Sequence, residues 1–445
     1  MTADRHDVIV IGAGIAGLAA AWDLRDRDVV VLERSERVGG RMRSETRGPH
    51  WLNLGAHVFG GDESAVGRLL TETGCQGAAI PGVLTAVSYR GRLVADGPLE
   101  LYPLRLPISL RARLEFVRVG LRLRRLVADY SAMARPRVGE SSAELQQRML
   151  EFMDDCSFTE ALGRLSPEVD AFFRCTLTRG TGEPEEIAAG YGVGYFHLAW
   201  NKDEGLGRNI VGGPQLLLDR LAAPHGDRIR FGTTATRIAQ SGDGVEVECD
   251  DGRVLRARSV IVTAPAHAAA SLIEGLPTAT EAALRAITYG PMISAAFLTD
   301  ESGPQRWDDI YAIATPGRAT SMLFNMDNVM RGRSAGRPDG SSFMSYSSAN
   351  LARQAAGLGD DAILDRYQGE LESVFPELQG HVVERQLHRV DPGIPHPFVG
   401  RSRIQQALMQ PLGRVQLAGD YLGTWYAETA VWSGRNAAAT AKQQP

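Results

Sequence analysis

The chain has 445 residues, of which 44% are apolar, so it is long enough to bury a large core and to form two or three domains. Its net charge of -5 gives no reason to expect nucleic acid as a partner, and no uninterrupted apolar run is long enough to span a bilayer. The four cysteines lack the spacing of a zinc site or a disulfide framework, so we predict free thiols, no metal and a cytoplasmic protein.

The first pattern along the chain is a strand, a glycine-rich turn and a helix. Residues 8–11 are four apolar β-formers that run directly into Gly12, Gly14 and Gly17, and an Ala-rich apolar stretch follows over 18–24. In a dinucleotide-binding turn the first glycine permits the bend, the second lets the backbone approach a pyrophosphate, and the third lets the helix pack on the strand. The next strand, 29–32, ends in Glu33, whose carboxylate can accept hydrogen bonds from a ribose. We therefore predict a Rossmann-type dinucleotide site.

The residues after Glu33 indicate which dinucleotide binds. The run Val38-Gly39-Gly40-Arg41 resembles the second signature of the flavin-containing amine oxidase superfamily, which includes monoamine and polyamine oxidases, protoporphyrinogen oxidases and phytoene desaturases. This resemblance implies FAD, with the paired glycines passing close under the cofactor and the Arg41 guanidinium on phosphate oxygens. No cysteine follows residue 249, so the cysteinyl flavin bond of monoamine oxidases has no residue at its usual place. We expect the FAD to be non-covalent.

The resemblance spreads the flavin contacts over the whole chain. It implies a strand ending beside the isoalloxazine ring, a small residue whose backbone contacts the adenine, and a C-terminal strand whose last residues meet the pyrophosphate and the ribityl chain. It also implies a last helix, opening at Thr429, whose first N–H groups point at the flavin O2 edge. The expected FAD-binding residues are Gly12, Ala13, Gly14, Ile15, Ala16, Gly17, Glu33, Arg34, Gly40, Arg41, Gly55, Ala56, Ala235, Gly419, Asp420, Ala430 and Val431.

Three residues are candidates for the catalytic site. His57 lies where the Gly55-containing strand meets the expected flavin, and its alternative interpretation is a packed or solvated histidine. By the resemblance, Tyr426 stands on one wall of the family's aromatic cage, next to Trp425, and such rings can steer an amine by cation–π contact. Simple packing is the alternative for both aromatic residues.

The opposing wall of this cage is open from sequence. The family's tyrosine is missing from the 391–401 segment, so His396 or Phe398 is a candidate. The aromatic-rich stretch 191–200 is either cavity lining or core.

The middle of the chain predicts an inserted domain. Strand-like pieces over 85–89 and 93–94 lead into a helix over about 109–133, in which Leu110, Leu114, Val117 and Leu121 recur at helical spacing among many arginines. A membrane-surface helix or an anion-attracting entrance fits this pattern, but a surface helix with its apolar stripe on the core fits it more simply.

The chain then returns to the first domain. A helix is expected after Gly212 and Gly213, and strands are expected over 228–238, 245–249, 254–257 and 259–265. A second excursion begins near 287, and there Ser294 occupies the position at which many amine oxidases carry a lysine that holds a water near flavin N5. The missing lysine puts the reaction with oxygen in doubt and favours a dehydrogenase or desaturase. An ordinary polar residue on a strand is the alternative for Ser294.

Together these patterns predict an α/β protein with a Rossmann-type FAD-binding domain (1–75, 205–285 and 386–445) and an inserted α+β substrate domain (76–204 and 286–385). The expected function is hydride transfer from a substrate C–H bond to flavin N5, which oxidises an amine to an imine. C–C desaturation of an apolar or cyclic substrate is the alternative, and a non-catalytic carrier like the GDP-dissociation inhibitors is a remote one. The expected partners are a small-molecule substrate and oxygen or another electron acceptor, while a homodimer and a weak membrane-surface contact stay open.

Overall fold

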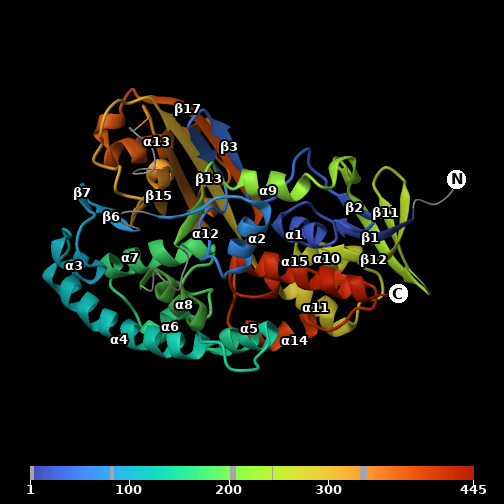
Figure 1. Cartoon of the computed structure of the whole chain (residues 1–445). Helices are drawn as coiled ribbons and strands as arrows, with labels where there is room; N and C mark the ends of the chain where they lie inside the picture. Colours follow the sequence, from blue (N-terminus) through green and yellow to red (C-terminus); the bar gives the residue numbers. More distant parts are fainter. Residues whose placement is uncertain (1–4, 81–84, 201–206, 243, 331–337, 445) are drawn as a thin grey trace.

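The computed structural model describes residues 5–80, 85–200, 207–242, 244–330 and 338–444. Two large sheets, each of seven strands, form the two halves of the elongated molecule (Figure 1). The sheet at the right of Figure 1 holds the N-terminal strand, and the tilted sheet at the left is covered below by a layer of helices.

The first sheet has the strand order β10-β11-β12-β1-β2-β9, and β18 pairs with the second half of β12. Five strands are parallel and β10 and β11 form an antiparallel hairpin. The bounds are β1 (Arg5–Ile11), β2 (Val29–Leu32), β9 (Ile229–Arg230), β10 (Ala235–Ser241), β11 (Gly244–Cys249), β12 (Val254–Val262) and β18 (Val415–Leu417).

Two expectations about this sheet are wrong in detail. The segment 228–238 is not one strand, because β9 ends at Arg230 and β10 begins at Ala235. These two strands lie at opposite edges of the sheet. The segments 254–257 and 259–265 are one strand, β12, which ends at Val262. The long β12 therefore pairs first with β11 and then with β18 along the same edge.

Both faces of this sheet are covered, which explains why the buried part of β1, residues 8–11, is apolar throughout. Val8 and Val10 pack on one face, and Ile9 and Ile11 pack on the other, because side chains alternate along a strand. The first face is covered by α1 (Ile15–Asp23), α2 (Ala65–Thr73), α9 (Gln215–Ala222) and α15 (Tyr426–Gln443). The second is covered by α10 (Ala266–Leu272), α11 (Thr278–Ala286) and α14 (Gln405–Leu408).

The second sheet has the order β17-β13-β16-β15-β14-β6-β7 and is antiparallel except between β14 and β6. The bounds are β6 (Ala86–Tyr89), β7 (Arg92–Val94), β13 (Tyr289–Thr299), β14 (Ala312–Ala314), β15 (Met322–Asn325), β16 (Ser342–Ser348) and β17 (Val382–Pro395). β17 crosses the domain boundary expected at residue 386, so we propose that the substrate domain extends to Pro395.

Helices pack on both faces of the second sheet. One face carries α12 (Ala349–Ala355) and α13 (Asp360–Val374). The other faces a layer of helices: α3 (Tyr102–Arg105), α4 (Leu110–Ala134), α5 (Ser142–Glu151), α6 (Phe158–Leu162), α7 (Pro167–Leu177) and α8 (Ala189–Trp200). Two small two-stranded sheets pair β3 (Ser44–Arg47) with β4 (His50–Asn53), and β5 (Gly77–Ala79) with β8 (Arg208–Ile210).

Short 3-10 helices complete the described chain. They are η1 (Leu99–Leu101), η2 (Thr178–Gly180), η3 (Gly226–Arg228), η4 (Met326–Met330), η5 (Pro376–Leu378), η6 (Arg401–Ile404) and η7 (Asp420–Leu422). Among the described helices, none is both long enough and apolar enough to cross a bilayer.

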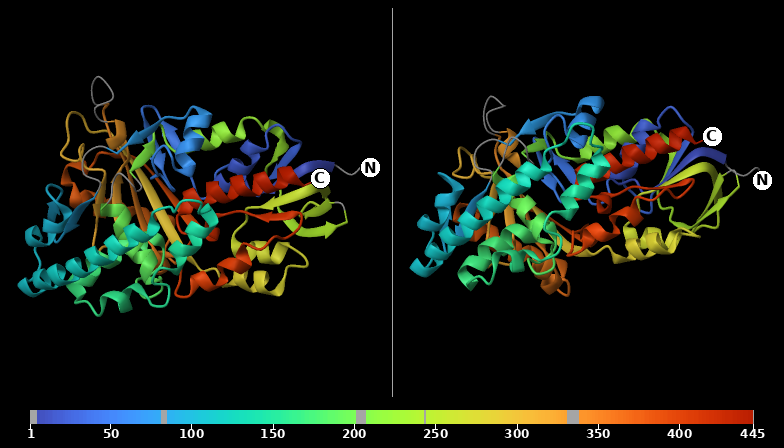
Figure 2. Two further views of the ribbon diagram at one scale, coloured as in Figure 1. Left: turned by 60° about the horizontal axis from the view of Figure 1, so that its bottom comes forward. Right: turned by 90° about the horizontal axis from the view of Figure 1, so that it is seen from below.

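The apolar stripe of the long helix α4 does not face the core, so the simpler interpretation of this stripe is wrong. Leu110, Leu114, Val117 and Leu121 are 72%, 66%, 53% and 67% exposed, so they do not pack on the core. The helix buries a different face, formed by Ala112, Val119, Leu123, Val127 and Tyr130. Figures 1 and 2 show α4 at the outer edge of the helical layer.

Candidate active site

The glycine-rich turn between β1 and α1 has the geometry that a pyrophosphate requires. Gly12 has a φ of 100°, which favours glycine, and a Cβ on Gly17 would lie 1.9 Å from the Gly12 carbonyl oxygen. Gly14 differs from both, since a Cβ there would meet no protein atom within 4 Å. The first and third glycines are thus required by the protein's own backbone, while the space beside Gly14 is left for a ligand.

The second glycine pair lies directly on this turn. The N–H of Gly39 donates to the Ala13 carbonyl at 2.8 Å, and a Cβ on Gly40 would come within 3.5 Å of the Gly14 Cα. The strand expected to end at Gly55 and Ala56 ends earlier, at Asn53, and Gly55 lies in the turn after it. This turn is close to the same loop, because a Cβ on Gly55 would lie 2.3 Å from the Arg41 carbonyl oxygen. Three segments expected at the flavin therefore meet in space.

Glu33 is buried at the end of β2 and faces the glycine turn. Its carboxylate accepts hydrogen bonds from the Ala13 N–H at 2.7 Å and from the Ser35 N–H at 2.9 Å. The carboxylate is held at the edge of the turn, where a ribose would follow the pyrophosphate. Ala235 is the buried first residue of β10, and Arg34 is exposed without a hydrogen bond to a described residue.

Arg41 and Asp420 form a bidentate ion pair. The two guanidinium nitrogens lie 2.8 and 2.9 Å from the two carboxylate oxygens, and Nη1 of Arg41 also donates to the Gly393 carbonyl at 2.9 Å. Burial by itself would lower the pKa of Arg41, but the Asp420 carboxylate outweighs it, so the pKa is raised. From sequence we expected Arg41 to bind phosphate oxygens and Asp420 to bind ribityl hydroxyls. The structure adds that the two side chains also form an ion pair with each other.

Helix α15 packs on α1 by backbone contact and holds the C-terminal strand end. A Cβ on Gly434 would lie 2.2 Å from the Ala16 carbonyl oxygen, and the Ser433 hydroxyl accepts from the Gly419 N–H at 2.9 Å. The helix begins at Tyr426, three residues before the expected start at Thr429, so that expectation is wrong. Its first N–H groups therefore belong to Tyr426 and the two residues after it, while Ala430 and Val431 are buried in the second turn.

These features fit an FAD cofactor. The space beside Gly14 lies at the start of α1, where no side chain caps the helix. Backbone N–H groups at such a helix start bind phosphate. Arg41 supplies a charge-assisted donor, and the Glu33 and Asp420 carboxylates supply acceptors for hydroxyl groups on either side.

Four aromatic side chains form what we call the aromatic cluster: Tyr191 and Tyr195 from α8, with Trp425 and Tyr426 at the start of α15. Tyr191 stacks on Trp425 with ring centroids 5.4 Å apart, and the Tyr195 and Tyr426 rings lie 6.5 Å apart at 63°. The Tyr426 hydroxyl donates to Tyr195 at 3.2 Å and contacts the Tyr191 hydroxyl. Burial raises the pKa of Tyr426 well above its usual value, so the phenol stays neutral.

The rings that contact Tyr426 belong to Tyr195 on α8 and to Trp425, while the two candidates for the opposing wall, His396 and Phe398, make other contacts. His396 hydrogen-bonds the Thr288 hydroxyl at 3.3 Å, and a Cβ on Gly182 would lie 2.9 Å from its ring. Phe398 pairs through its backbone with Ile187. No ring contact joins either side chain to Tyr426 in the described chain.

His57 is buried between the turn at Gly55 and the ring of Phe324. Its Nδ1 lies 2.9 Å from the Gly55 carbonyl, which assigns the proton to Nδ1, and its ring meets the Phe324 ring edge-on at 4.7 Å. Burial lowers its pKa to about 4, so the imidazole is neutral at physiological pH. Within the described residues, Nε2 is buried without a hydrogen-bond partner.

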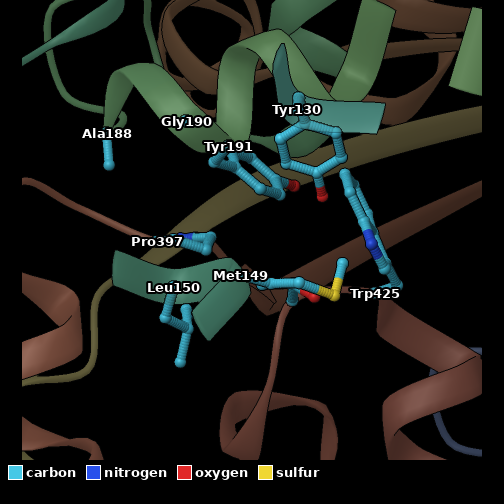
Figure 3. A pocket seen from close by; sticks show the side chains of 9 residues that line it. Tyr130, Met149, Leu150, Ala188, Gly190, Tyr191, Pro397 and Trp425 are labelled. Atoms are coloured by element: carbon cyan, nitrogen blue, oxygen red, sulfur yellow. The ribbon is translucent and has the colours of Figure 1, made fainter. Parts of the chain in front are cut away.

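A narrow pocket adjoins the aromatic cluster (Figure 3). Tyr191 and Trp425 belong to both, and Figure 3 shows Tyr191 at the top of the view, Trp425 at the right, and Met149, Leu150 and Pro397 below Tyr191. The remaining lining residues are Tyr130, Ala188, Gly190 and Thr424.

Sequence reasoning missed two residues of this region. Tyr195 was noticed only as part of an aromatic run, and its spacing of four residues from Tyr191 is the signal that both lie on one face of α8. Arg179, in η2, was not noticed at all, although its guanidinium lies 5.9 Å from the Tyr195 ring.

Ser294 lies beside the strand end expected at the flavin. Its side chain is fully buried on β13 and donates to the Leu54 carbonyl at 2.8 Å, one residue before Gly55. The hydroxyl hydrogen is therefore bonded to the backbone just after β4. Unlike a lysine ammonium group, this hydroxyl has no second hydrogen to donate to a water.

Comparisons with known proteins agree with this geometry. The family model described as flavin containing amine oxidoreductase matches residues 15–441. A flavin-containing amine oxidase of Danio rerio is 25% identical over 98% of this chain and 86% of its own length, and amine oxidase B of Sus scrofa is 25% identical over 97% and 85%.

Solved structures share the fold. Putrescine oxidase with bound putrescine superposes with a TM-score of 0.76 at 18% identity, over 98% of each chain. Cyclohexylamine oxidase from Brevibacterium oxydans gives a TM-score of 0.76 at 20% identity, also over 98% of each chain. The family match over most of the chain shows that the protein belongs to the family of flavin-containing amine oxidoreductases and is an FAD-dependent oxidoreductase.

Proposed function

We propose that the protein oxidises an amine to an imine. The substrate carbon next to nitrogen gives up a hydride, the nitrogen loses a proton, and the two electrons remain with FAD as the hydride acceptor. The observation that supports this most is the aromatic cluster, which stands at the start of α15 beside segments that fit the flavin.

The protein's own groups have limited tasks in this reaction. The rings of Tyr426 and Trp425 can hold an amine by cation–π contact and exclude water. The positive end of the α15 dipole favours negative charge that develops near it on reduction. The buried His57, with its pKa of about 4, is a poor general base near neutral pH, and we propose that the substrate reacts as the neutral amine.

The two alternatives expected from sequence have less support. The family match and the amine oxidases among the relatives and structural neighbours favour amine oxidation over C–C desaturation. A non-catalytic carrier has no use for a glycine turn with room for pyrophosphate or for a complete set of flavin-binding segments.

The electron acceptor is oxygen or another oxidant. Because Ser294 replaces the expected lysine and its hydroxyl bonds to Leu54, we propose that reduced enzyme reacts slowly with oxygen.

The test is the visible absorbance of the FAD-loaded protein under anaerobic conditions. Primary, secondary and cyclic amines are added in turn, and oxygen is admitted last. Bleaching by an amine supports amine oxidation, and the rate at which colour returns in oxygen separates an oxidase from a dehydrogenase. If no amine bleaches a yellow protein, the proposal is overturned in favour of desaturation.

Tyr426 gives a direct test of the aromatic cluster. We expect Tyr426→Ala to lower kcat/KM for the amine by about tenfold or more, since a cation–π contact contributes on the order of 1 to 2 kcal/mol when desolvated. Tyr426→Phe keeps the ring face and is the matched control, with kcat/KM within a few-fold of wild type. FAD content, measured by absorbance, should be unchanged in both, and an Ala variant with wild-type kinetics would remove Tyr426 from the substrate site.

The exposed side of α4 favours a second proposal, a weak contact with an anionic membrane surface. We call Leu110, Leu114, Val117 and Leu121 the α4 ridge. At 100° per residue these positions fall within about 60° of each other, on the side of the helix away from the buried face. Exposed arginines lie on both sides of the ridge, including Arg111, Arg118, Arg122, Arg124 and Arg125.

The positive charge of the arginines around the α4 ridge favours an anionic membrane over a second copy of the chain as its partner. A two-fold dimer through α4 would bring two arginine-rich faces together, which like-charge repulsion disfavours. Anionic lipid headgroups attract arginine at about 1 kcal/mol per side chain, while the leucines enter the acyl boundary. We propose that the protein works in the cytoplasm, where all four cysteines stay free thiols, and rests α4 on the inner leaflet.

Co-sedimentation with vesicles tests the α4 ridge. We expect binding to vesicles of phosphatidylglycerol and phosphatidylcholine, weak binding to phosphatidylcholine alone, and release by salt. The Leu114→Gln/Leu121→Gln variant should bind at least about tenfold more weakly, because it removes two apolar anchors. Leu216→Gln, at an exposed leucine on α9, is the control. Equal binding by the double variant, or a concentration-dependent dimer that the double variant abolishes, would contradict the proposal.

A further inference from the structure

Arg179 is a cation among aromatic side chains that the proposed reaction has not yet used. It lies in η2, directly after α7, and its guanidinium is 5.9 Å from the ring centroids of both Tyr195 and Phe324. Its Nε is buried and has no hydrogen-bond partner among the described residues. Burial by itself would lower the pKa of Arg179, but the neighbouring phenol groups, Tyr346 and Tyr195 first, outweigh it and raise the pKa. The side chain is therefore charged.

No carboxylate in the described chain pairs with this charge. Arg174, five residues earlier, is held by the carboxylates of Asp170, Glu183 and Glu185, and Arg41 is held by Asp420. The groups that stabilise Arg179 are neutral phenols. Arg179 is partly buried, and a cation partly withdrawn from water is stabilised by a negative charge beside it, so this position favours an anion.

Arg179 faces the same space as the aromatic cluster and His57. A Cβ on the next residue, Gly180, would lie 2.7 Å from the Tyr191 hydroxyl and 3.1 Å from the Tyr426 hydroxyl. The charge of Arg179 also helps to lower the pKa of His57, whose ring shares Phe324 with it. The cation thus lies beside Tyr195 of the aromatic cluster and beside Phe324, whose ring also contacts His57.

We propose that Arg179 binds a carboxylate of the substrate, so that the substrate class is amines that carry a carboxylate, such as apolar amino acids. This inference rests on the proposed amine oxidation. A guanidinium matches a carboxylate with two parallel hydrogen bonds, and the surrounding rings suit an apolar or aromatic side chain.

A carboxylate fits better than a phosphate because the charges balance. Arg179 carries one positive charge, and the nearby His57 is neutral. A phosphate monoester carries about two negative charges at neutral pH and would leave one uncompensated. A simple amine would leave a positive charge uncompensated. Its ammonium form is repelled by the guanidinium of Arg179 when no carboxylate neutralises that guanidinium.

The test compares two substrates that differ only in the carboxylate, L-phenylalanine and 2-phenylethylamine, with the FAD-loaded enzyme under anaerobic conditions. We expect L-phenylalanine to reduce the flavin of the wild type at lower concentration. In Arg179→Met the apparent Kd for L-phenylalanine should rise about 100-fold, because the charged hydrogen-bond partner of the carboxylate is lost. The apparent Kd for 2-phenylethylamine should stay the same or fall. Arg179→Lys should restore part of the affinity, and Arg285→Met, at an exposed arginine of α11, should change nothing.

Binding of benzoate separates this inference from the reaction itself. Calorimetric titration of the FAD-loaded wild type should show benzoate binding that Arg179→Met loses and Arg179→Lys partly keeps. If 2-phenylethylamine reduces the flavin but neither L-phenylalanine nor benzoate binds, the carboxylate site is overturned while amine oxidation stands. If neither substrate reduces the flavin but benzoate binds through Arg179, the anion site stands and amine oxidation fails. Equal benzoate affinity in wild type and Arg179→Met overturns the role of Arg179.

Discussion

The Gly14→Val variant is expected to fold and to fail to retain FAD. A Cβ on Gly14 meets no protein atom within 4 Å, and the residue has extended backbone with φ -71° and ψ 175°, which valine adopts without strain. The new side chain would instead fill the space at the start of α1 where the pyrophosphate belongs. We expect FAD affinity to fall by about 100-fold or more, corresponding to a loss of ~3 kcal/mol.

Two further variants make this result specific. Gly120→Val, on α4, also adds a side chain in open space and should keep FAD. Gly17→Ala should fail in a different way, because its Cβ would lie 1.9 Å from the Gly12 carbonyl oxygen and force α1 off β1. Flavin absorbance after gel filtration and the thermal midpoint of the apoprotein distinguish the two failures. A Gly14→Val protein purified with full FAD would overturn the placement of the cofactor.

Removing the carboxylate of Asp420 should cost both stability and flavin affinity. Asp420 is 9% exposed and its partner Arg41 is 35% exposed, so the pair is only partly buried. We expect Asp420→Ala to lower the free energy of unfolding of the apoprotein by about 2 kcal/mol, less than the cost of breaking a fully buried pair. FAD affinity should fall further, since an acceptor for ribityl hydroxyls is lost as well.

A double variant separates the effect on stability from the effect on FAD affinity. Arg41→Met/Asp420→Leu removes both charges and should recover part of the stability that Asp420→Ala loses, because no unpaired charge remains. It should not recover FAD affinity. Chemical unfolding of the apoproteins measures the first quantity, and FAD titration measures the second. If Asp420→Ala binds FAD as the wild type does, the expected contact of Asp420 with the cofactor is wrong.

The aromatic run over 191–200 did not by itself reveal which other residues it would contact. Tyr191 and Tyr195 were ambiguous between cavity and core, and His396 and Phe398 were the candidates for the wall opposite Tyr426. The structure instead brings α8 against the start of α15, more than 200 residues later, where Tyr191 stacks on Trp425. Nothing in either segment alone encodes this contact, since it depends on how the helical layer packs against the first domain.

The α4 ridge was interpreted in the wrong direction for a similar reason. An apolar stripe at helical spacing shows that a helix is amphipathic but not which stripe is buried when there are two. Here a second apolar stripe, which includes Val119 and Leu123, faces the core, and the α4 ridge faces outward.

Sequence by itself determined the features whose physics is local. The glycine turn, the apolar strand before it and the acid at Glu33 are set by backbone sterics and by spacing within one strand–helix–strand unit, so few residues suffice to predict them. Only the tertiary structure decided the rest: the Arg41–Asp420 pair, the walls around Tyr426, and the place of Arg179 without a counter-ion among the described residues. Each of these depends on distances between groups that are far apart in the chain, and such distances follow from how two sheets and their helices pack together.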